Sequence, residues 1–288
     1  MAGNLTLADA RHFISNVIAI AVALLLTASA RPEISFWSGF AHPQIYVMAA
    51  DGTRARALTN LYSAKRGAWS PDGRRIAFDG RFHETVSDFD IGVMNADGSG
   101  IRRVTRGPAR DVMAAWSPDG RWLAFSRRRT ETAEPEVWLV RPNGRDAHPL
   151  IRGGAPAWSP NGRWIAFDTP GGVWAVRPDG SGRRQIVAGN LGSLKWSPDG
   201  RRVAYTDWQR NTSEIYVARA DGSRPHRLTR NGVDDFEPAW SPDGRRILYT
   251  HGRENAHAVY TMKSDGSSKR RLTRGGDSWA TSWRPPSR

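Results

Sequence analysis

The stretch that decides the fold runs from Ala68 to Phe78 and reads Ala-Trp-Ser-Pro-Asp-Gly-Arg-Arg-Ile-Ala-Phe. An apolar segment leads into the tryptophan, Ser-Pro-Asp-Gly has the composition of a type I turn, and a second apolar segment returns. The same unit begins at Trp116, Trp196 and Trp240, occurs with Asn at Trp158, and ends as Trp-Arg-Pro at Trp283. Six units spaced 38 to 47 residues apart indicate a repeat protein.

A second marker lies between these units. An Asp-Gly or Asn-Gly pair begins at Asp51, Asp97, Asn143, Asp179, Asp221 and Asp265. Such pairs favour tight hairpins because their residues tolerate positive φ. In the unit at Trp240, strands are expected up to the tryptophan and at 246–249, 258–262 and 271–273. Four short antiparallel strands are typical of one propeller blade. The sequence therefore predicts an all-β fold, a six-bladed β-propeller of four-stranded blades.

The two ends of the chain carry complementary parts of one blade. Residues 34–59 lack a tryptophan strand, whereas residues 278–283 supply one. Pairing of the N- and C-terminal segments would close the ring without a free sheet edge at its seam. We therefore expect a single propeller domain over residues 31–288, with the six tryptophans as core spacers between blades.

The first thirty residues differ from the repeats. Arg11 and His12 precede an apolar run from Val17 to Leu26, and Ala28-Ser29-Ala30 follows with the spacing that signal peptidases accept. This pattern predicts a signal peptide over residues 1–30. An uncleaved membrane anchor is the alternative, although the run is shorter than the ~20 apolar residues of a spanning helix. We expect an exported protein, periplasmic or otherwise extracytoplasmic, which contacts the membrane only if this segment stays uncleaved.

The charge of the chain bears on its partners. The formal net charge is +14, from 42 lysines and arginines against 28 acids, and there is no cysteine. A basic protein attracts acidic partners, and outside the cytoplasm these are phospholipid headgroups, cell-wall polymers and acidic proteins. We therefore expect no nucleic-acid partner, and disulfides are excluded.

The repeats also resemble those of a known family. The segments at 68–78 and 91–105, the second reading Ile-Gly-Val-Met-Asn-Ala-Asp-Gly-Ser-Gly-Ile-Arg-Arg-Val-Thr, are similar to the WD-repeat-like propeller units of the TolB family. The resemblance covers roughly residues 34 to 284. It implies an exported binding module, since the TolB propeller binds the peptidoglycan-associated lipoprotein of the Tol-Pal envelope system. TolB also has an α/β domain ahead of its propeller, and only three residues separate Ala30 from the first expected strand here.

The candidate site lies on the face opposite the turns. Because the chain reverses at every strand, both kinds of turn share one end of each blade, and the variable loops share the other. The entrance of each tryptophan strand would line the channel rim. The rim and the variable loops supply the candidate partner-binding residues: Lys65, Arg66, Arg81, His83, Arg110, Asp111, Arg152, Asp207, Trp208, Asp234, Asp235, Glu237, His251, Arg253 and Asp277.

The sequence contains no complete catalytic motif. The histidines lack metal-ligand spacing, and the Asp-Gly turns lack the spaced ligand series of a calcium loop. We expect no metal or other cofactor, and a monomer that binds an envelope protein or an acidic envelope polymer. The alternative is a lyase or hydrolase acting on an acidic polysaccharide, with His83, His251 or the rim acids as base.

Overall fold

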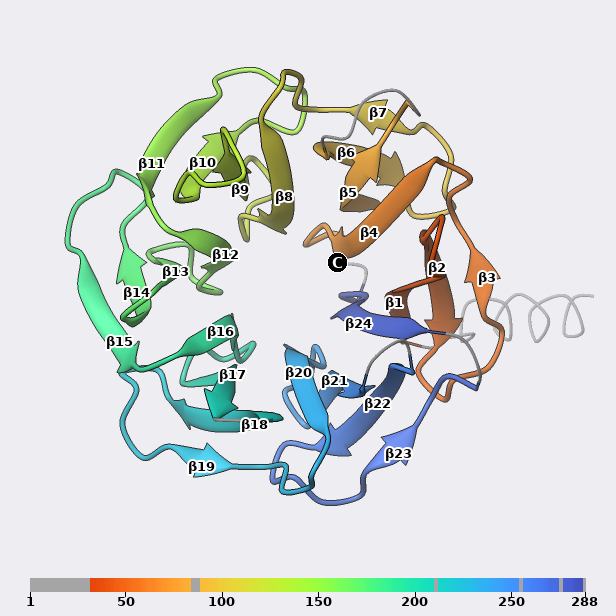
Figure 1. Ribbon diagram of the computed structural model, residues 1–288, viewed down its shortest axis with the longest axis vertical. Helices are drawn as coiled ribbons and strands as arrows, with labels where there is room; N and C mark the ends of the chain where they lie inside the picture. The colour runs from red at the N-terminus through yellow and green to blue at the C-terminus, as the bar shows by residue number, and fades with distance from the viewer. Residues whose placement is uncertain (1–31, 84–88, 210–211, 254–255, 275–276, 287–288) are drawn as a thin grey trace, which may run out of the picture. The chain divides into compact units, whose positions relative to one another are not determined.

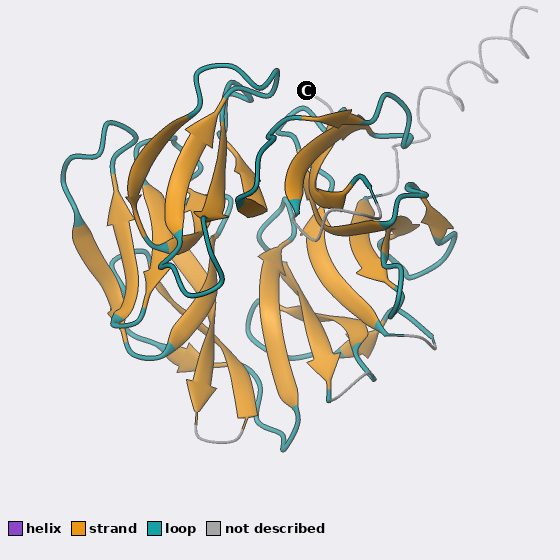
Figure 2. Cartoon of the chain, turned by 45° about the horizontal axis from the view of Figure 1, so that its top comes forward, coloured by secondary structure: helices purple, strands orange, loops and turns teal. Residues whose placement is uncertain are grey.

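The computed structural model describes residues 32–83, 89–209, 212–253, 256–274 and 277–286. The predicted signal segment lies outside these residues. The described chain consists of strands and loops, with 24 strands in six four-stranded sheets arranged around a centre (Figures 1 and 2). Within the ranges given, no helix is long and apolar enough to cross a membrane. The prediction of a six-bladed propeller is confirmed.

The blades are numbered here in chain order, each from the channel outwards. Blade 1 contains β24 (Ser278–Trp283), β1 (Glu33–Ser38), β2 (Gln44–Ala49) and β3 (Arg56–Ala57). Blade 2 contains β4 (Ser63–Trp69), β5 (Arg75–Arg81), β6 (Asp90–Asn95) and β7 (Arg102–Arg103). Blade 3 contains β8 (Arg110–Trp116), β9 (Leu123–Arg128), β10 (Glu136–Val140) and β11 (His148–Arg152).

The remaining blades follow the same plan. Blade 4 contains β12 (Gly154–Trp158), β13 (Ile165–Thr169), β14 (Gly172–Val176) and β15 (Arg184–Ala188). Blade 5 contains β16 (Leu191–Trp196), β17 (Arg202–Gln209), β18 (Thr212–Arg219) and β19 (His226–Arg227). Blade 6 contains β20 (Asp234–Trp240), β21 (Arg246–Gly252), β22 (Ala258–Lys263) and β23 (Arg270–Arg271).

The ring closes as the sequence predicts. The last strand, β24, pairs antiparallel with the first, β1, and brings Trp283 opposite Ile34. Trp37 stacks on Trp279 across the same seam, with ring centroids 4.8 Å apart. Blade 1 is therefore built from both ends of the domain.

All pairings within the blades are antiparallel, which defines two faces. The turn face carries eleven turns, and the loop face carries the variable connections between second and third strands. With the strand residue at each end included, the turns span 49–56, 69–75, 95–102, 116–123, 140–148, 158–165, 176–184, 196–202, 219–226, 240–246 and 263–270. The expectation that the variable loops share one face is confirmed by this register.

The Ser-Pro-Asp-Gly turns are held by their own side chains. In the turn after Trp69, the Ser70 hydroxyl donates to Asp72 and accepts from the Arg75 N–H at 2.9 Å. The Asp72 carboxylate also accepts from the Arg74 N–H at 3.1 Å. Gly73 adopts φ +64°, in the left-handed region that glycine favours. The repeated motif is thus a self-contained turn.

The core lies between neighbouring blades. Trp69 packs with Ile45 of blade 1 and Phe78 of blade 2, and Trp240 packs with Ile215 of blade 5 and Tyr249 of blade 6. The six repeated tryptophans are buried or half-buried. Their role as spacers between blades agrees with this packing, and all six core clusters lie within Pro32–Arg288, which forms one compact unit.

Candidate functional site: the central channel and its mouth

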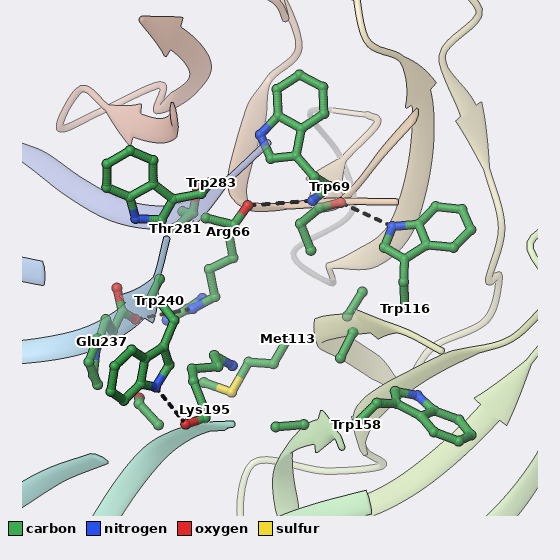
Figure 3. A pocket seen from close by; sticks show the side chains of 18 of the residues that line it. Arg66, Trp69, Met113, Trp116, Trp158, Lys195, Glu237, Trp240, Thr281 and Trp283 are labelled. Carbon is green, nitrogen blue, oxygen red and sulfur yellow. Dashed lines mark hydrogen bonds and ion pairs between the residues drawn. The ribbon is translucent and has the colours of Figure 1, made fainter. Parts of the chain in front are cut away.

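Each blade contributes its first strand to a central channel. The first strands surround the centre of the ring (Figure 1). A cavity of about 340 Å³ is lined by residues of all six of them, including the six repeated tryptophans, and Figure 3 labels Trp69, Trp116, Trp158, Trp240 and Trp283. The tryptophans lie where these strands reach the turn face. Residues toward the beginning of each strand therefore face the channel nearer to the loop face.

Five of the first strands bulge at the same point. Arg66, Met113, Ala155, Ser193 and Glu237 each lie three residues before the tryptophan and have φ between 47° and 62°. The pairing register with the second strand shifts beside each of them. A bulge re-aims a side chain, and these five residues line the central cavity (Figure 3). Residues of unlike chemistry thereby occupy equivalent positions around the channel.

Bonds between blades hold these bulges in place. The buried Asp79 carboxylate in blade 2 accepts from the Met113 N–H in blade 3 at 2.8 Å. Asp168 accepts from the Ser193 N–H of the next blade at 3.1 Å. The corresponding acceptors of the Ala155 and Glu237 N–H groups are the hydroxyls of Ser126 and Thr206. One position of the second strand therefore fixes the channel wall of the following blade.

A charged cluster occupies the middle of the channel. Arg66 Nη1 lies 3.3 Å from Asp79 Oδ2, and Arg66 Nε lies 3.8 Å from Glu237 Oε1. Arg66 and Glu237 are close in Figure 3, and Lys195 lies on the adjoining first strand. Burial lowers the pKa of Lys195 and raises the pKa of Glu237. The cluster therefore brings both signs of charge together where water is restricted.

Two carboxylate oxygens of the channel wall have no hydrogen-bond partner among the described residues, Glu237 Oε2 and Asp168 Oδ1. Burial raises the pKa of Asp168 to about 7, although the hydrogen bond from the Ser193 N–H and the charge of Lys195 both lower it. An unsatisfied buried acceptor costs free energy, so a ligand or water that donates to it would bind favourably.

The channel opens on the loop face into a wider, basic mouth. A pocket of about 830 Å³ lies between blades 2, 3 and 4 and is lined by Arg66, Arg110, Arg128 and Arg129. Its acids are Glu131 and Asp168. The Arg110 guanidinium stacks on Phe89 at 5.0 Å, and among the described residues neither Arg110 nor Arg128 forms an ion pair. This part of the mouth suits an anionic group.

An aromatic row borders the opposite side of the mouth. Trp208 stacks on Phe236 with centroids 6.2 Å apart, Phe236 meets Trp279 at 5.1 Å, and Trp279 stacks on Trp37. Lys65 Nζ lies 4.9 Å above the Trp37 ring. The row passes from blade 5 through blade 6 to blade 1, and Trp208 at its end is 48% exposed. Phe236 and Trp37 are buried, so Trp208 is the member of the row that offers apolar surface at the mouth.

The structure brings some of the predicted site residues together at the channel. Arg66 and Glu237 lie in its wall, Arg110 lines the mouth, and Lys65 and Trp208 belong to the aromatic edge. These five residues come from blades 2, 3, 5 and 6. Whether they bind a partner stays a prediction.

Several predicted acids are instead engaged in local bonds. Asp111 is buried and accepts two hydrogen bonds from Arg127, both at 2.7 Å. Asp235 is buried and bonds the His251 ring at 2.7 Å. Asp277 accepts from the His257 N–H and lies 2.7 Å from its ring. Asp234 accepts from both the N–H and the hydroxyl of Ser213. These contacts give the four acids a structural role.

The other predicted residues lie further from the channel. Arg81 stacks on Tyr62 at 4.6 Å, and His83 and Arg253 are exposed in loops of blades 2 and 6. Asp207 is half-buried in β17, opposite Glu214. Arg152 ends the outermost strand of blade 3 and so does not open a first strand as its place in the sequence suggested.

The alternative enzymatic hypothesis gains no support from this geometry. Its candidate bases His83 and His251 come from blades 2 and 6, and His251 is held by Asp235. No group of three histidine, aspartate or glutamate side chains suited to a metal ion occurs among the described residues.

Comparison with known proteins supports the propeller fold and shows a similarity to TolB. Residues 147–287 match the family described as TolB beta propeller domain. The Tol-Pal system protein TolB of Anaeromyxobacter dehalogenans is 36% identical over 99 residues, which cover 31% of this chain. The chain spans about a fifth of that relative, 21% of its length.

Two solved structures have the same architecture over most of the chain. TolB from Acinetobacter baumannii superimposes with a TM-score of 0.77 and 16% identity, covering 93% of this chain and 71% of that one. The putative TolB from Agrobacterium tumefaciens gives a TM-score of 0.70 and 18% identity, covering 88% of this chain and 92% of that one. The six closed blades and these superpositions establish a six-bladed β-propeller, and the sequence match over residues 147–287 makes the domain similar to the TolB propellers.

Proposed function

We propose that this protein is an extracytoplasmic binding module that holds an acidic segment of an envelope protein at the loop-face mouth of its channel. The similarity to a Tol-Pal system protein supports a protein partner in the cell envelope. The signal segment predicted over residues 1–30 supports export. The observation that carries the proposal is the pocket of about 830 Å³ with four arginines in its wall.

The two halves of the mouth suit a segment that carries both an acidic and an apolar group. An extended segment could place a carboxylate between Arg110 and Arg128 and an apolar side chain against Trp208 and Phe236. Arginine guanidinium groups bind carboxylates in a bidentate manner, and exposed aromatic side chains are frequent anchors in interfaces. A polysaccharide of acidic units would also match the basic half and can stack a sugar ring on Trp208, so the similarity to a Tol-Pal system protein is what favours a protein ligand.

The test is affinity capture from an envelope extract with three forms of the protein. The first is residues 31–288, the second carries Arg110→Glu and Arg128→Glu, and the third carries Arg106→Glu and Arg230→Glu. Both pairs are exposed and lie on the loop face, and both change the net charge equally. The captured protein is identified by mass spectrometry and its acidic segments are made as peptides for titration.

The proposal expects the wild type and the Arg106/Arg230 variant to retain the same protein, and the mouth variant to lose it. Reversal of a charge that contacts the ligand is expected to weaken peptide binding at least tenfold. Equal retention by all three forms would place the interface elsewhere. If no form retains a protein, an acidic polysaccharide becomes the leading ligand.

A further inference from the structure

The positive charge of the domain gathers on the turn face. The eleven turns defined above contain 21 of the 42 lysines and arginines but only 10 of the 28 aspartates and glutamates. The rest of the described residues contain 17 basic and 14 acidic side chains, most of them in the channel and on the loop face. The turn face thus holds an excess of eleven positive charges, while the remainder is close to neutral.

Part of this charge serves the fold. In blades 2 and 5 the second arginine after the turn glycine stacks on the tryptophan of the next blade, Arg75 on Trp116 at 4.8 Å and Arg202 on Trp240 at 4.7 Å. Arginine at this position therefore has a packing role, which would hold it there without any ligand.

The first arginine after the turn glycine has no such role. Arg74, Arg121, Arg163, Arg201 and Arg245 occupy this position, one in each of blades 2 to 6. All five side chains are exposed. Within the described part of the chain, only Arg121 forms an ion pair, 4.0 Å from Asp119, while Arg74, Arg201 and Arg245 interact at longer range with the aspartate of their own turn, and none of the five stacks on a ring. These arginines form a ring of exposed positive charge on the turn face.

The chain enters the domain at this same face. The Pro32 carbonyl accepts a hydrogen bond from the Ala50 N–H at 2.8 Å, and Ala50 belongs to the turn 49–56. Five residues, 27–31, separate Pro32 from the apolar run that ends at Leu26. The most apolar segment of the sequence is therefore joined to the most basic face of the domain. The segment is predicted to be a signal peptide, and only where it stays uncleaved would it add the apolar insertion that, together with a basic patch, gives stable attachment to a bilayer.

From these observations we propose that the turn face docks on a bilayer surface that contains anionic phospholipid headgroups. Arginines spread over one end of a disc-shaped domain can approach a planar surface together. Each basic side chain near such a surface strengthens binding by roughly fivefold, an effect that falls off within about 10 Å at moderate salt. In this orientation the loop face and its channel mouth point away from the membrane, toward a partner.

Sedimentation with lipid vesicles tests the proposal. The protein is residues 32–288, which contain all six blades and all six core clusters and therefore omit the apolar segment without opening the ring. The probes are vesicles of phosphatidylcholine with phosphatidylglycerol and vesicles of phosphatidylcholine alone. One variant carries Arg74→Gln, Arg163→Gln and Arg245→Gln, and the control carries Arg106→Gln, Arg230→Gln and Arg274→Gln on the loop face. All six arginines are exposed, and circular dichroism and thermal unfolding verify each fold.

The wild type and the control are expected to bind the phosphatidylglycerol vesicles and not the neutral ones, with binding lost as salt is raised. The turn-face variant is expected to bind on the order of a hundredfold more weakly, from three residues at roughly fivefold each. Equal binding by the two variants would overturn the proposal, because the net charge of the protein, and not the location of its arginines, would then determine its affinity for the vesicles. Absence of binding by the wild type, with retention of an inorganic polyphosphate instead, would also overturn it.

Discussion

Asp79 is the residue whose replacement best tests how the channel wall is built. Its buried carboxylate accepts from the Met113 N–H of the next blade at 2.8 Å and from Arg66 Nη1 at 3.3 Å. Hydrogen bonds to a charged group contribute about 1.5 to 3 kcal/mol each. The Arg66 side chain is 28% exposed and keeps Glu237 as a neighbour, so its share is discounted. We expect Asp79→Ala to lower the free energy of unfolding by about 3 kcal/mol.

The assay is urea unfolding followed by tryptophan fluorescence, with thermal unfolding as a second measurement. For a domain of this size, 3 kcal/mol corresponds to a fall in Tm of about 10 °C. The matched control is Ser126→Ala. It removes the equivalent acceptor, a hydroxyl of blade 3 that accepts from the Ala155 N–H of blade 4. A neutral hydroxyl contributes only about 1 kcal/mol. If Asp79→Ala lowers the free energy of unfolding by no more than Ser126→Ala does, the charged carboxylate stabilises the channel wall no better than a neutral hydroxyl. That result would refute the reasoning.

Three further changes test other parts of the structure. The pKa of Asp168 is raised by burial to about 7 in the folded state, so the folded protein binds more protons than the unfolded one between about pH 4 and 7, and stability falls as pH rises through this window. Asp168→Asn should flatten that dependence in urea unfolding at several pH values, and an unchanged slope would contradict it. Gly222→Ala should lower the free energy of unfolding by over 3 kcal/mol, because the added Cβ would lie 1.8 Å from the Ile186 carbonyl oxygen. Gly180 has a similar φ and open space around it, so Gly180→Ala should lower the free energy of unfolding by only about 1 kcal/mol in the same assay. Removal of residues 278–288 should open the ring and give rapid proteolysis of blade 1, while removal of 287–288 alone should not.

The sequence was sufficient to predict the fold because its repeat is also a local structure. Ser70, Asp72 and Gly73 close their turn with bonds among themselves, so the motif forms the same turn in each blade that contains it. The alternation of two turn types then fixes which connections share a face. Closure was predictable for the same reason, since the two incomplete repeats add up to one blade.

The channel was less predictable because its equivalent positions share no residue type. Arg66, Met113, Ala155, Ser193 and Glu237 differ in size and charge, and only the count of three residues before each tryptophan relates them. That count was the available signal for the channel wall. The aromatic row could not be found this way, because Phe236 and Trp279 meet only after two blades have packed.

The basic turn face depends on two neighbouring positions of the repeat, the fifth and the sixth residue after the tryptophan, which differ in their contacts. At the sixth position after the tryptophan, Arg75 and Arg202 are tied to the core by stacking on the tryptophan of the next blade, and Trp122 and Trp164 take this place in blades 3 and 4. Among the described residues, the arginine at the fifth position stacks on no aromatic ring, yet it is present in five blades. A sequence bias toward arginine would act on both positions alike and on the loop face as well, where basic and acidic residues nearly balance. The charge therefore follows the geometry of the blade, as expected if the turn face binds a planar anionic surface and the loop face binds a partner, which are the two proposals made above.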